Sequence, residues 1–158
     1  MENLEGDILD IEEGVICHQV NCFGIMGAGL AAAIRKEYPE VYDSYKKLCY
    51  SYGDEDRFNL LGQIQVVPVG ENKRVVNLFG QYDIGGERAT EYCALATSLA
   101  NLQEWATKTG DVIWLGGGSV PIYLPFKIGC GLGGGDWGIV KNIIYNKLPR
   151  AVVVRKRD

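Results

Sequence analysis

Residues 127–137 read Lys-Ile-Gly-Cys-Gly-Leu-Gly-Gly-Gly-Asp-Trp. An apolar, β-rich segment precedes them and an apolar pattern at helical spacing follows, which predicts a strand, a glycine loop and a helix. Glycine loses much conformational entropy on ordering, so five glycines within seven positions need a steric reason. Inward-facing amides of such a loop can bind an anion, assisted by the dipole of the next helix. A flexible connector is the alternative, and the missing G-K-[ST] excludes an NTPase P-loop.

A second glycine-rich stretch, residues 21–32, reads Asn-Cys-Phe-Gly-Ile-Met-Gly-Ala-Gly-Leu-Ala-Ala. It follows a predicted strand at 15–20 and opens a predicted helix at 28–38. Gly27, Gly29 and Ala32 fit the loose dinucleotide pattern G-x-G-x-x-A. A dinucleotide fold would next show a strand ending in an acidic residue, whereas residues 45–53 predict helix and polar loop. A structural role in helix packing, with Asn21 capping the loop, is the other alternative.

The remaining pattern predicts one α/β domain. Strands are expected at 63–69 and 74–79, joined as an antiparallel hairpin, and at 112–115, 122–128 and 151–155. Helices are expected at 41–51, from about 90 to 108, and after Asp136 as N-cap. We therefore expect a mixed sheet between helices, with a ligand beyond the carboxyl ends of the strands.

Composition narrows the class of protein. The chain has 158 residues, 47% hydrophobic and 23% charged, which is typical of one globular domain. The net charge of −4 argues against a broad nucleic-acid surface, so an anionic ligand would be held mainly by backbone. No apolar run reaches the length of a membrane span, and residues 1–6 do not resemble a signal peptide.

Cysteine and histidine usage bears on compartment and metal. Five cysteines without a C-x-x-C pair predict reduced thiols and a cytoplasmic location. With one histidine, a zinc cage is not expected, and we predict neither metal nor cofactor. Cys22 and Cys130 lie within the two glycine-rich stretches. Each is a candidate thiol nucleophile, with a small buried cysteine as the commoner alternative.

Four segments together resemble, in the same order, the macro domain: residues 6–8 (Gly-Asp-Ile), 18–29 (His-x-x-Asn followed by Met-Gly-Ala-Gly), 77–79 (Asn-Leu-Phe) and 127–137. The nearest likeness is to the branch with yeast-type ADP-ribose-1″-phosphate phosphatases, terminal ADP-ribose protein glycohydrolases and DNA ADP-ribosyl glycohydrolases. The resemblance spans nearly the whole chain. It implies a three-layer α/β/α macro-domain fold with a mixed central sheet and a cleft for ADP-ribose or a derivative.

The resemblance also implies a set of ligand-binding residues. In the family, the residue at Asp7 accepts a hydrogen bond from the adenine amino group, Ile8 supports the ring, and Asn21 bonds the distal ribose. An ordinary solvated loop carboxylate is the alternative for Asp7. The full set is Asp7, Ile8, Asn21, Gly27, Ala28, Gly29, Gly129, Cys130, Gly131, Leu132, Gly133, Gly134 and Gly135.

Candidates for catalysis are Asn21, His18 and Asp83. A regular strand would send the side chains of positions 18 and 21 to opposite faces, which favours a buried His18. A role as general acid or base is the alternative, because histidine titrates near neutrality. Lys127 could steer phosphate or face solvent.

The chain also departs from the family pattern. Gln81 stands where the glycohydrolases of the branch have lysine, and Gly133 where the protein glycohydrolases have aspartate. Asp136 is better explained as a helix cap. Residues 116–121 form a longer insert than expected, a candidate hairpin at the edge of the cleft.

Three functions follow from the resemblance and its departures. The favoured hypothesis is a hydrolase that removes the phosphate from ADP-ribose-1″-phosphate. A non-catalytic module that binds ADP-ribose or a related nucleotide is the second. An ADP-ribosyl glycohydrolase without the usual lysine is the third.

Overall fold

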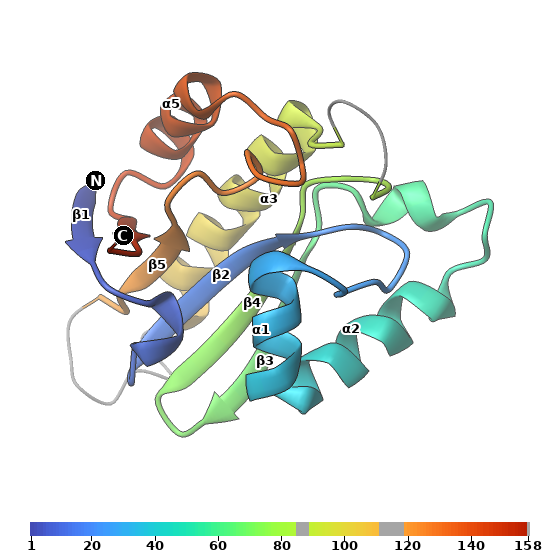
Figure 1. The fold of residues 1–158 in the computed structure, drawn as a ribbon, viewed down its shortest axis with the longest axis horizontal. Helices are drawn as coiled ribbons and strands as arrows, with labels where there is room; N and C mark the ends of the chain where they lie inside the picture. The colour runs from blue at the N-terminus through green and yellow to red at the C-terminus, as the bar shows by residue number, and fades with distance from the viewer. Residues whose placement is uncertain (85–88, 111–118, 158) are drawn as a thin grey trace.

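The computed structural model describes residues 1–84, 89–110 and 119–157. In this part of the chain one sheet of six strands lies between two layers of helices (Figure 1). The strand order is β1-β6-β5-β2-β4-β3. Neighbouring strands are parallel except for the antiparallel pair of β3 and β4. The strands are β1 (Glu2–Glu5), β2 (Gly14–Val20), β3 (Ile64–Gly70), β4 (Lys73–Phe79), β5 (Ile122–Pro125) and β6 (Val152–Arg155).

Helices of the described residues cover both faces of the sheet (Figure 1). On one face lie α1 (Gly29–Glu37) and α2 (Pro39–Ser51), and on the other lie α3 (Tyr92–Trp105) and α5 (Trp137–Lys147). Short helical turns complete the described elements: η1 (Ile8–Asp10), η2 (Arg57–Leu60) and η3 (Ala106–Gly110). No described helix is long and apolar enough to cross a membrane.

Strand β2 divides the core. Val15 and Cys17 pack with α3 and α5, whereas Ile16 and Val20 pack with α1 and α2. This alternation follows from the two-residue period of a strand, and each buried aliphatic side chain contributes about 2 kcal/mol. His18 and Gln19 at the end of β2 therefore face opposite layers.

The structure confirms most of the predicted elements, including the mixed sheet and the hairpin of β3 and β4. The strand expected at 122–128 is wrong at its end: β5 stops at Pro125, because Ile128 N bonds Pro125 O at 3.0 Å in a turn. β1 was not predicted, since all four of its residues are exposed and carry no apolar pattern. The expected strand at 112–115 and residues 116–118 of the insert lie outside the described residues.

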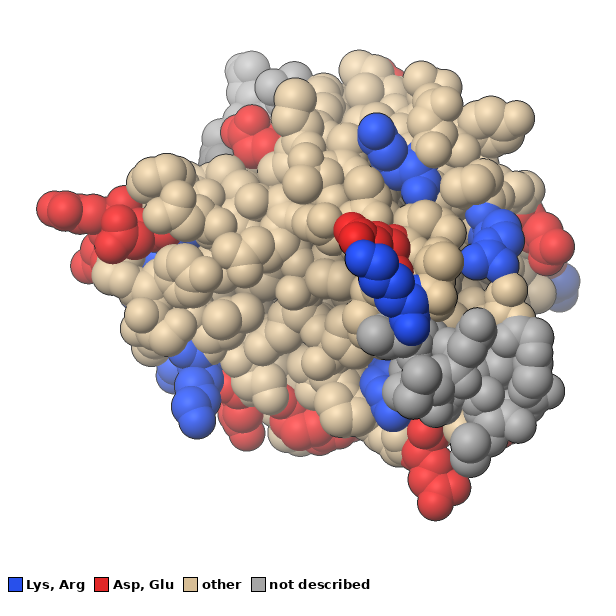
Figure 2. Space-filling model, turned by 180° about the vertical axis from the view of Figure 1, so that it is seen from behind, with Lys and Arg blue, Asp and Glu red and all other residues tan. Residues whose placement is uncertain are grey.

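The carboxyl ends of β2 and β5 meet at one edge of the sheet, where both glycine-rich loops begin. Val120 and Pro121 enter β5 from its other end, so this part of the insert does not border that edge. On the face opposite that of Figure 1, the described Lys and Arg side chains stand apart from one another (Figure 2). That face therefore carries no continuous basic surface among the residues described.

Candidate functional site

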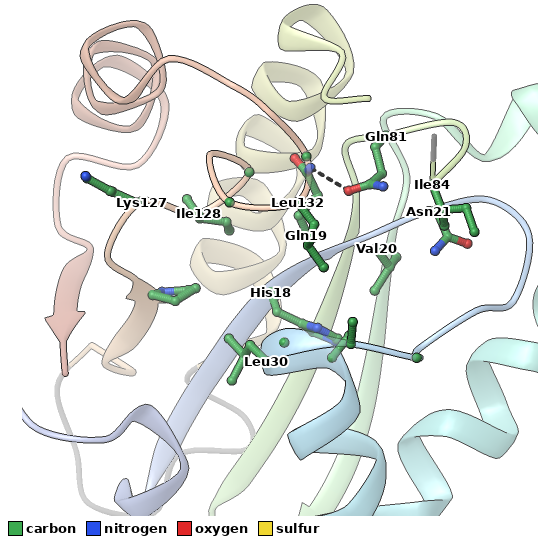
Figure 3. A pocket seen from close by; sticks show the side chains of 18 of the residues that line it. His18, Gln19, Val20, Asn21, Leu30, Gln81, Ile84, Lys127, Ile128 and Leu132 are labelled. Atoms are coloured by element: carbon green, nitrogen blue, oxygen red, sulfur yellow. Dashed lines mark hydrogen bonds between the residues drawn. The ribbon is translucent and has the colours of Figure 1, made fainter. Parts of the chain in front are cut away.

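A cavity of about 590 Å³ lies between the two glycine-rich loops (Figure 3). The loop after β2, the first turn of α1 and the turn after β5 form its walls. Lys127 is the only charged side chain among the described lining residues, and Figure 3 shows it pointing outward. An anion in this cavity would therefore meet mainly backbone groups, as the sequence predicts.

A second hollow of about 540 Å³ adjoins the first. It is lined by η1 and by the ends of β5 and β6, and it includes Asp7, Ile8, Arg155 and Lys156. The two hollows share Gly29, Leu30, Pro125, Phe126 and Lys127. They form one groove with the start of α1 at its middle, a shape that suits an elongated ligand.

Asn21 organises the first glycine loop. Its Oδ1 accepts hydrogen bonds from Phe23 N at 2.9 Å and from the Tyr45 hydroxyl at 2.7 Å, and its Nδ2 donates to Ile25 O at 2.8 Å. The side chain is only 5% exposed, yet it lines the cavity. It caps the loop, as one sequence alternative held, and its role toward a distal ribose stays a prediction.

The first loop leads into a helix without a side-chain cap. Ala28 occupies the N-cap position of α1 and makes no side-chain hydrogen bond. The first N–H groups of a helix lack intrahelical acceptors, and here the positive end of the helix dipole lies against the groove. Gly27, Ala28 and Gly29 all line the cavity. This arrangement can hold an anion at the middle of the groove.

The second glycine loop packs on two side chains that the sequence analysis missed, Gln19 and Thr90. Gln19 Nε2 donates to Thr90 Oγ1 at 2.8 Å, and Thr90 Oγ1 donates to Gly129 O at 2.7 Å. A Cβ on Gly133 would lie 2.4 Å from Thr90 Oγ1 and 2.8 Å from Gly129 O. Close packing therefore requires glycine at position 133. In the sequence, only its position next to His18, on the opposite face of the strand, marks Gln19. No sequence pattern distinguishes Thr90.

The end of the second loop turns away from the groove. Gly129, Gly131, Leu132 and Gly133 line the cavity, but Cys130, Gly134 and Gly135 do not. Asp136 caps α5, with its Oδ1 accepting from Ile139 N at 3.2 Å. The dipole of the next helix was expected to assist this loop in binding an anion, but the N-terminus of α5 has its own carboxylate cap.

His18 is buried at 2% exposure, and its Nε2 lies 2.6 Å from Asn77 Oδ1. Burial lowers the pKa of His18 to about 4, although the bond to Asn77 acts in the opposite direction. The imidazole is therefore neutral at pH 7. His18 nevertheless lines the cavity, so it is buried and adjacent to the ligand space at once.

The loop after β4 places Gln81 and Asp83 differently. Gln81 lines the cavity, and its Oε1 accepts from Gln19 Nε2 at 3.0 Å (Figure 3). Asp83 is exposed, its Oδ1 accepts from Ile84 N at 2.7 Å, and it does not line the cavity. The structure therefore brings Asn21, His18 and Gln81 together, and the catalytic role of Asp83 stays a prediction.

Neither loop cysteine is an activated thiol. Burial raises the pKa of Cys22 to about 12, with Cys49 adding to the effect. Burial also raises the pKa of Cys130, as does the nearby carboxylate of Asp136. Thiolate is the nucleophilic form, so neither thiol is activated. Cys22 fits the buried-cysteine alternative, whereas Cys130 is only partly buried. Among the described residues, no group of three or more His, Cys, Asp or Glu is placed to hold a metal ion.

The second hollow contains the residues expected at an adenine. Asp7 Oδ1 accepts from Leu9 N at 2.9 Å, and Lys156 Nζ lies 3.6 Å from Asp7 Oδ2. Ile8 is buried at the wall. Phe126, which lies after the end of β5 and not within a strand, lines both hollows, and the Arg155 guanidinium lies 4.5 Å from the centre of its ring.

No protein-family model matches this sequence. An uncharacterized 17.5 kDa protein of Enterobacteria phage T4 is 29% identical over 155 residues, which is 96% of this chain and 93% of that protein. A DNA ADP-ribosyl glycohydrolase of Mycobacterium bovis is 39% identical over 44 residues, covering 28% of this chain and 12% of that enzyme. An ADP-ribose 1″-phosphate phosphatase of Aspergillus oryzae is 34% identical over 53 residues, covering 33% and 26%.

Solved structures match over nearly the whole chain. A Bacteroides thetaiotaomicron protein of unknown function is 28% identical, with a TM-score of 0.80 and 99% of both chains covered. The macrodomain of Mycobacterium tuberculosis DarG is 21% identical, with a TM-score of 0.74, covering 99% of this chain and 97% of that one. Thermosipho africanus DarTG in complex with ADP-ribose is 18% identical, with a TM-score of 0.71, covering 99% and 42%. This chain therefore has the macrodomain fold.

Proposed function

We propose that this protein binds ADP-ribose along the groove formed by the two hollows. Adenosine occupies the hollow with Asp7 and Ile8, the diphosphate lies at the start of α1, and the distal ribose lies near Asn21. The observation that carries the proposal is the shared wall of the hollows, where the uncapped helix end sits. The similarity to DarTG solved with ADP-ribose supports the same ligand.

Each part of this ligand meets suitable groups. A diphosphate needs N–H donors more than side-chain cations when it is buried at a helix N-terminus. The apolar side chains Ile25, Ile84 and Leu132 are exposed at the wall of the cavity, with Leu132 at 75% exposure. They lose contact with water when a ligand covers them, which favours binding.

Isothermal titration calorimetry with ADP-ribose tests the binding proposal. We expect saturable binding with one molecule per chain, and weaker binding of AMP, because AMP lacks the second phosphate and the distal ribose. Absence of detectable heat with ADP-ribose, together with no shift in melting temperature, would contradict the proposal.

A second proposal is hydrolysis of ADP-ribose-1″-phosphate, favoured by the local match to an ADP-ribose 1″-phosphate phosphatase. Water adds to phosphorus and the bond to the 1″ oxygen breaks, which releases phosphate and ADP-ribose. We propose water as the nucleophile because both loop thiols are protonated and because the side chain of Gln81 is an amide, which is not nucleophilic. Asn21 orients the ribose in this proposal.

Phosphate release from ADP-ribose-1″-phosphate, measured beside a protein-free control, tests the second proposal. We expect equal amounts of phosphate and ADP-ribose. Binding without phosphate release would leave the protein as a module that only binds. Release of ADP-ribose from modified protein or DNA would instead support the glycohydrolase alternative.

A further inference from the structure

A chain of hydrogen bonds crosses the sheet beneath α2 and has a fixed direction. Gln65 Nε2 donates to the backbone oxygen of Ser44 at 3.0 Å. A backbone carbonyl can only accept, so the amide of Gln65 must place its NH₂ group toward Ser44. Its Oε1 therefore points to Asn77.

Asn77 continues this chain of hydrogen bonds, with the same donor-to-acceptor order, as far as the cavity. Its Nδ2 donates to Gln65 Oε1 at 2.9 Å, which leaves Oδ1 facing His18 Nε2 at 2.6 Å. The three residues are register partners across β3, β4 and β2. Because Oδ1 can only accept, Nε2 of His18 must carry the proton.

The other ring nitrogen is left as an acceptor. A neutral imidazole protonated at Nε2 has a lone pair on Nδ1. Nδ1 of His18 is buried and has no hydrogen-bond partner among the described residues. His18 lines the cavity, so a ligand donor can supply the missing bond.

We propose that Asn77 is a positioning residue that holds His18 as the neutral Nε2–H imidazole, so that Nδ1 accepts a hydrogen bond from a hydroxyl of the distal ribose. The inference rests on the proposed binding of ADP-ribose. It assigns His18 the role of acceptor at neutral pH, because its one ring proton is committed to Asn77.

The surroundings keep the ring neutral. The titratable side chains of the same core half are two cysteines and six tyrosines: Cys22, Cys49, Tyr38, Tyr42, Tyr45, Tyr52, Tyr82 and Tyr123. Burial raises the pKa of Cys22, Cys49 and Tyr45, so none of these three is charged at pH 7. On α1, the side chains that pack there are Leu30, Ala31 and Ile34.

Nitrogen-15 NMR of the ring tests the proposal directly, because His18 is the only histidine. In the free protein we expect the signature of an Nε2–H tautomer with an unbonded Nδ1. Saturating ADP-ribose should shift the Nδ1 resonance upfield while the ring stays neutral. ADP, which lacks the distal ribose, should leave that resonance in place.

Two results overturn the inference: an Nδ1–H tautomer in the free protein, or equal Nδ1 shifts with ADP and ADP-ribose. The free-protein spectrum tests Asn77 independently of any ligand. A calorimetric titration without binding would instead contradict the proposed function.

An Asn77→Asp variant adds a charge beside the ring and provides a second test. It should keep the Nε2–H bond and raise the pKa of His18, because a nearby negative charge favours imidazolium. Affinity for ADP-ribose should then fall about tenfold for each pH unit below the raised pKa, as the acceptor form is depleted.

Wild type and Asn142→Asp, an exposed α5 site, should show no such dependence above pH 5.5. Equal pH profiles for Asn77→Asp and Asn142→Asp would refute the positioning role.

Discussion

The two loops are both rich in glycine but are held in place by different contacts. The first, after β2, is held by the side chain of Asn21 and leads into α1, whose N-terminus has no side-chain cap. The second, after β5, is held by Thr90 and by its own backbone, with Gly135 N bonding Gly129 O at 2.8 Å. It leads into α5, which Asp136 caps. Only the first loop therefore offers a free helix end to the groove.

Glycine therefore has a different role in each loop: it permits close packing in one and leaves space for a ligand in the other. In the second loop, glycine at 133 lets the chain pack against Thr90 and Gly129, so the groove wall can lie close to β2. In the first, Gly27 and Gly29 have no other atoms nearer than 3.8 Å to an added Cβ, and space remains for a ligand. The number of glycines in a loop sequence therefore does not show whether they serve packing of the chain or binding of a ligand.

Replacing Asn21 should break the first loop with the largest effect on stability. Asn21→Ala removes bonds to Phe23 N, Ile25 O and the Tyr45 hydroxyl, and we expect a loss of about 4 kcal/mol in unfolding free energy. Urea denaturation measures it. Asn101→Ala, which loses one bond to Gly62 O, is the control and should lose about 1 kcal/mol. Equal losses would argue that Asn21 does not organise the loop.

Acid should lower the unfolding free energy through His18, the single histidine, which lies on the α1 side of the sheet. The unfolded chain binds a proton at His18 below about pH 6.5 and the folded chain only below about pH 4, so folded-state stability falls as pH drops through this range. Relative to His18→Gln, wild type should lose about 3 kcal/mol between pH 7 and pH 4. Parallel pH profiles of unfolding free energy for the two proteins would contradict this account.

Two alanine substitutions within the second loop should differ sharply. Gly133→Ala places a Cβ against the backbone oxygen of Gly129, and we expect it to cost about 2 kcal/mol and to weaken ADP-ribose binding. Gly131→Ala meets no atom within 4 Å and should be tolerated. Thermal melts and calorimetry of both variants test the packing role of Gly133, and a tolerated Gly133→Ala would disprove it.

Removing the cap of α5 should have a small effect, confined to stability. Asp136→Ala loses the bond from Ile139 N and should cost about 1 kcal/mol. ADP-ribose affinity should not change, since Asp136 does not line either hollow. A large change in affinity would mean that the two helix ends share one ligand.

The sequence was sufficient for most of the fold, because apolar periodicity and glycine positions mark the elements. It predicted β2, α1 and the hairpin of β3 and β4, because each of these segments contains a short apolar run. It missed β1, whose pairing with β6 depends on backbone bonds between the two ends of the chain. Such long-range pairing has no local pattern.

The site was predicted in part. Asp7, Ile8, Asn21 and parts of both loops line the two hollows, whereas Cys130, Gly134 and Gly135 do not, and the binding roles of these residues stay a prediction. Gln19 and Thr90 could not be found, because their roles arise from hydrogen bonds between residues 71 positions apart. The tautomer of His18 depends on Gln65 and the Ser44 carbonyl, which only the folded chain brings together.

Calorimetric titration of ADP-ribose into wild type and Ala28→Asp tests the central claim, that the uncapped end of α1 binds the diphosphate. An aspartate at the N-cap should stabilise the helix by about 1 kcal/mol, yet place a negative charge where the phosphates bind. We expect a melting temperature at or above that of wild type together with at least about a tenfold loss of affinity. Unchanged affinity in this folded variant would contradict it.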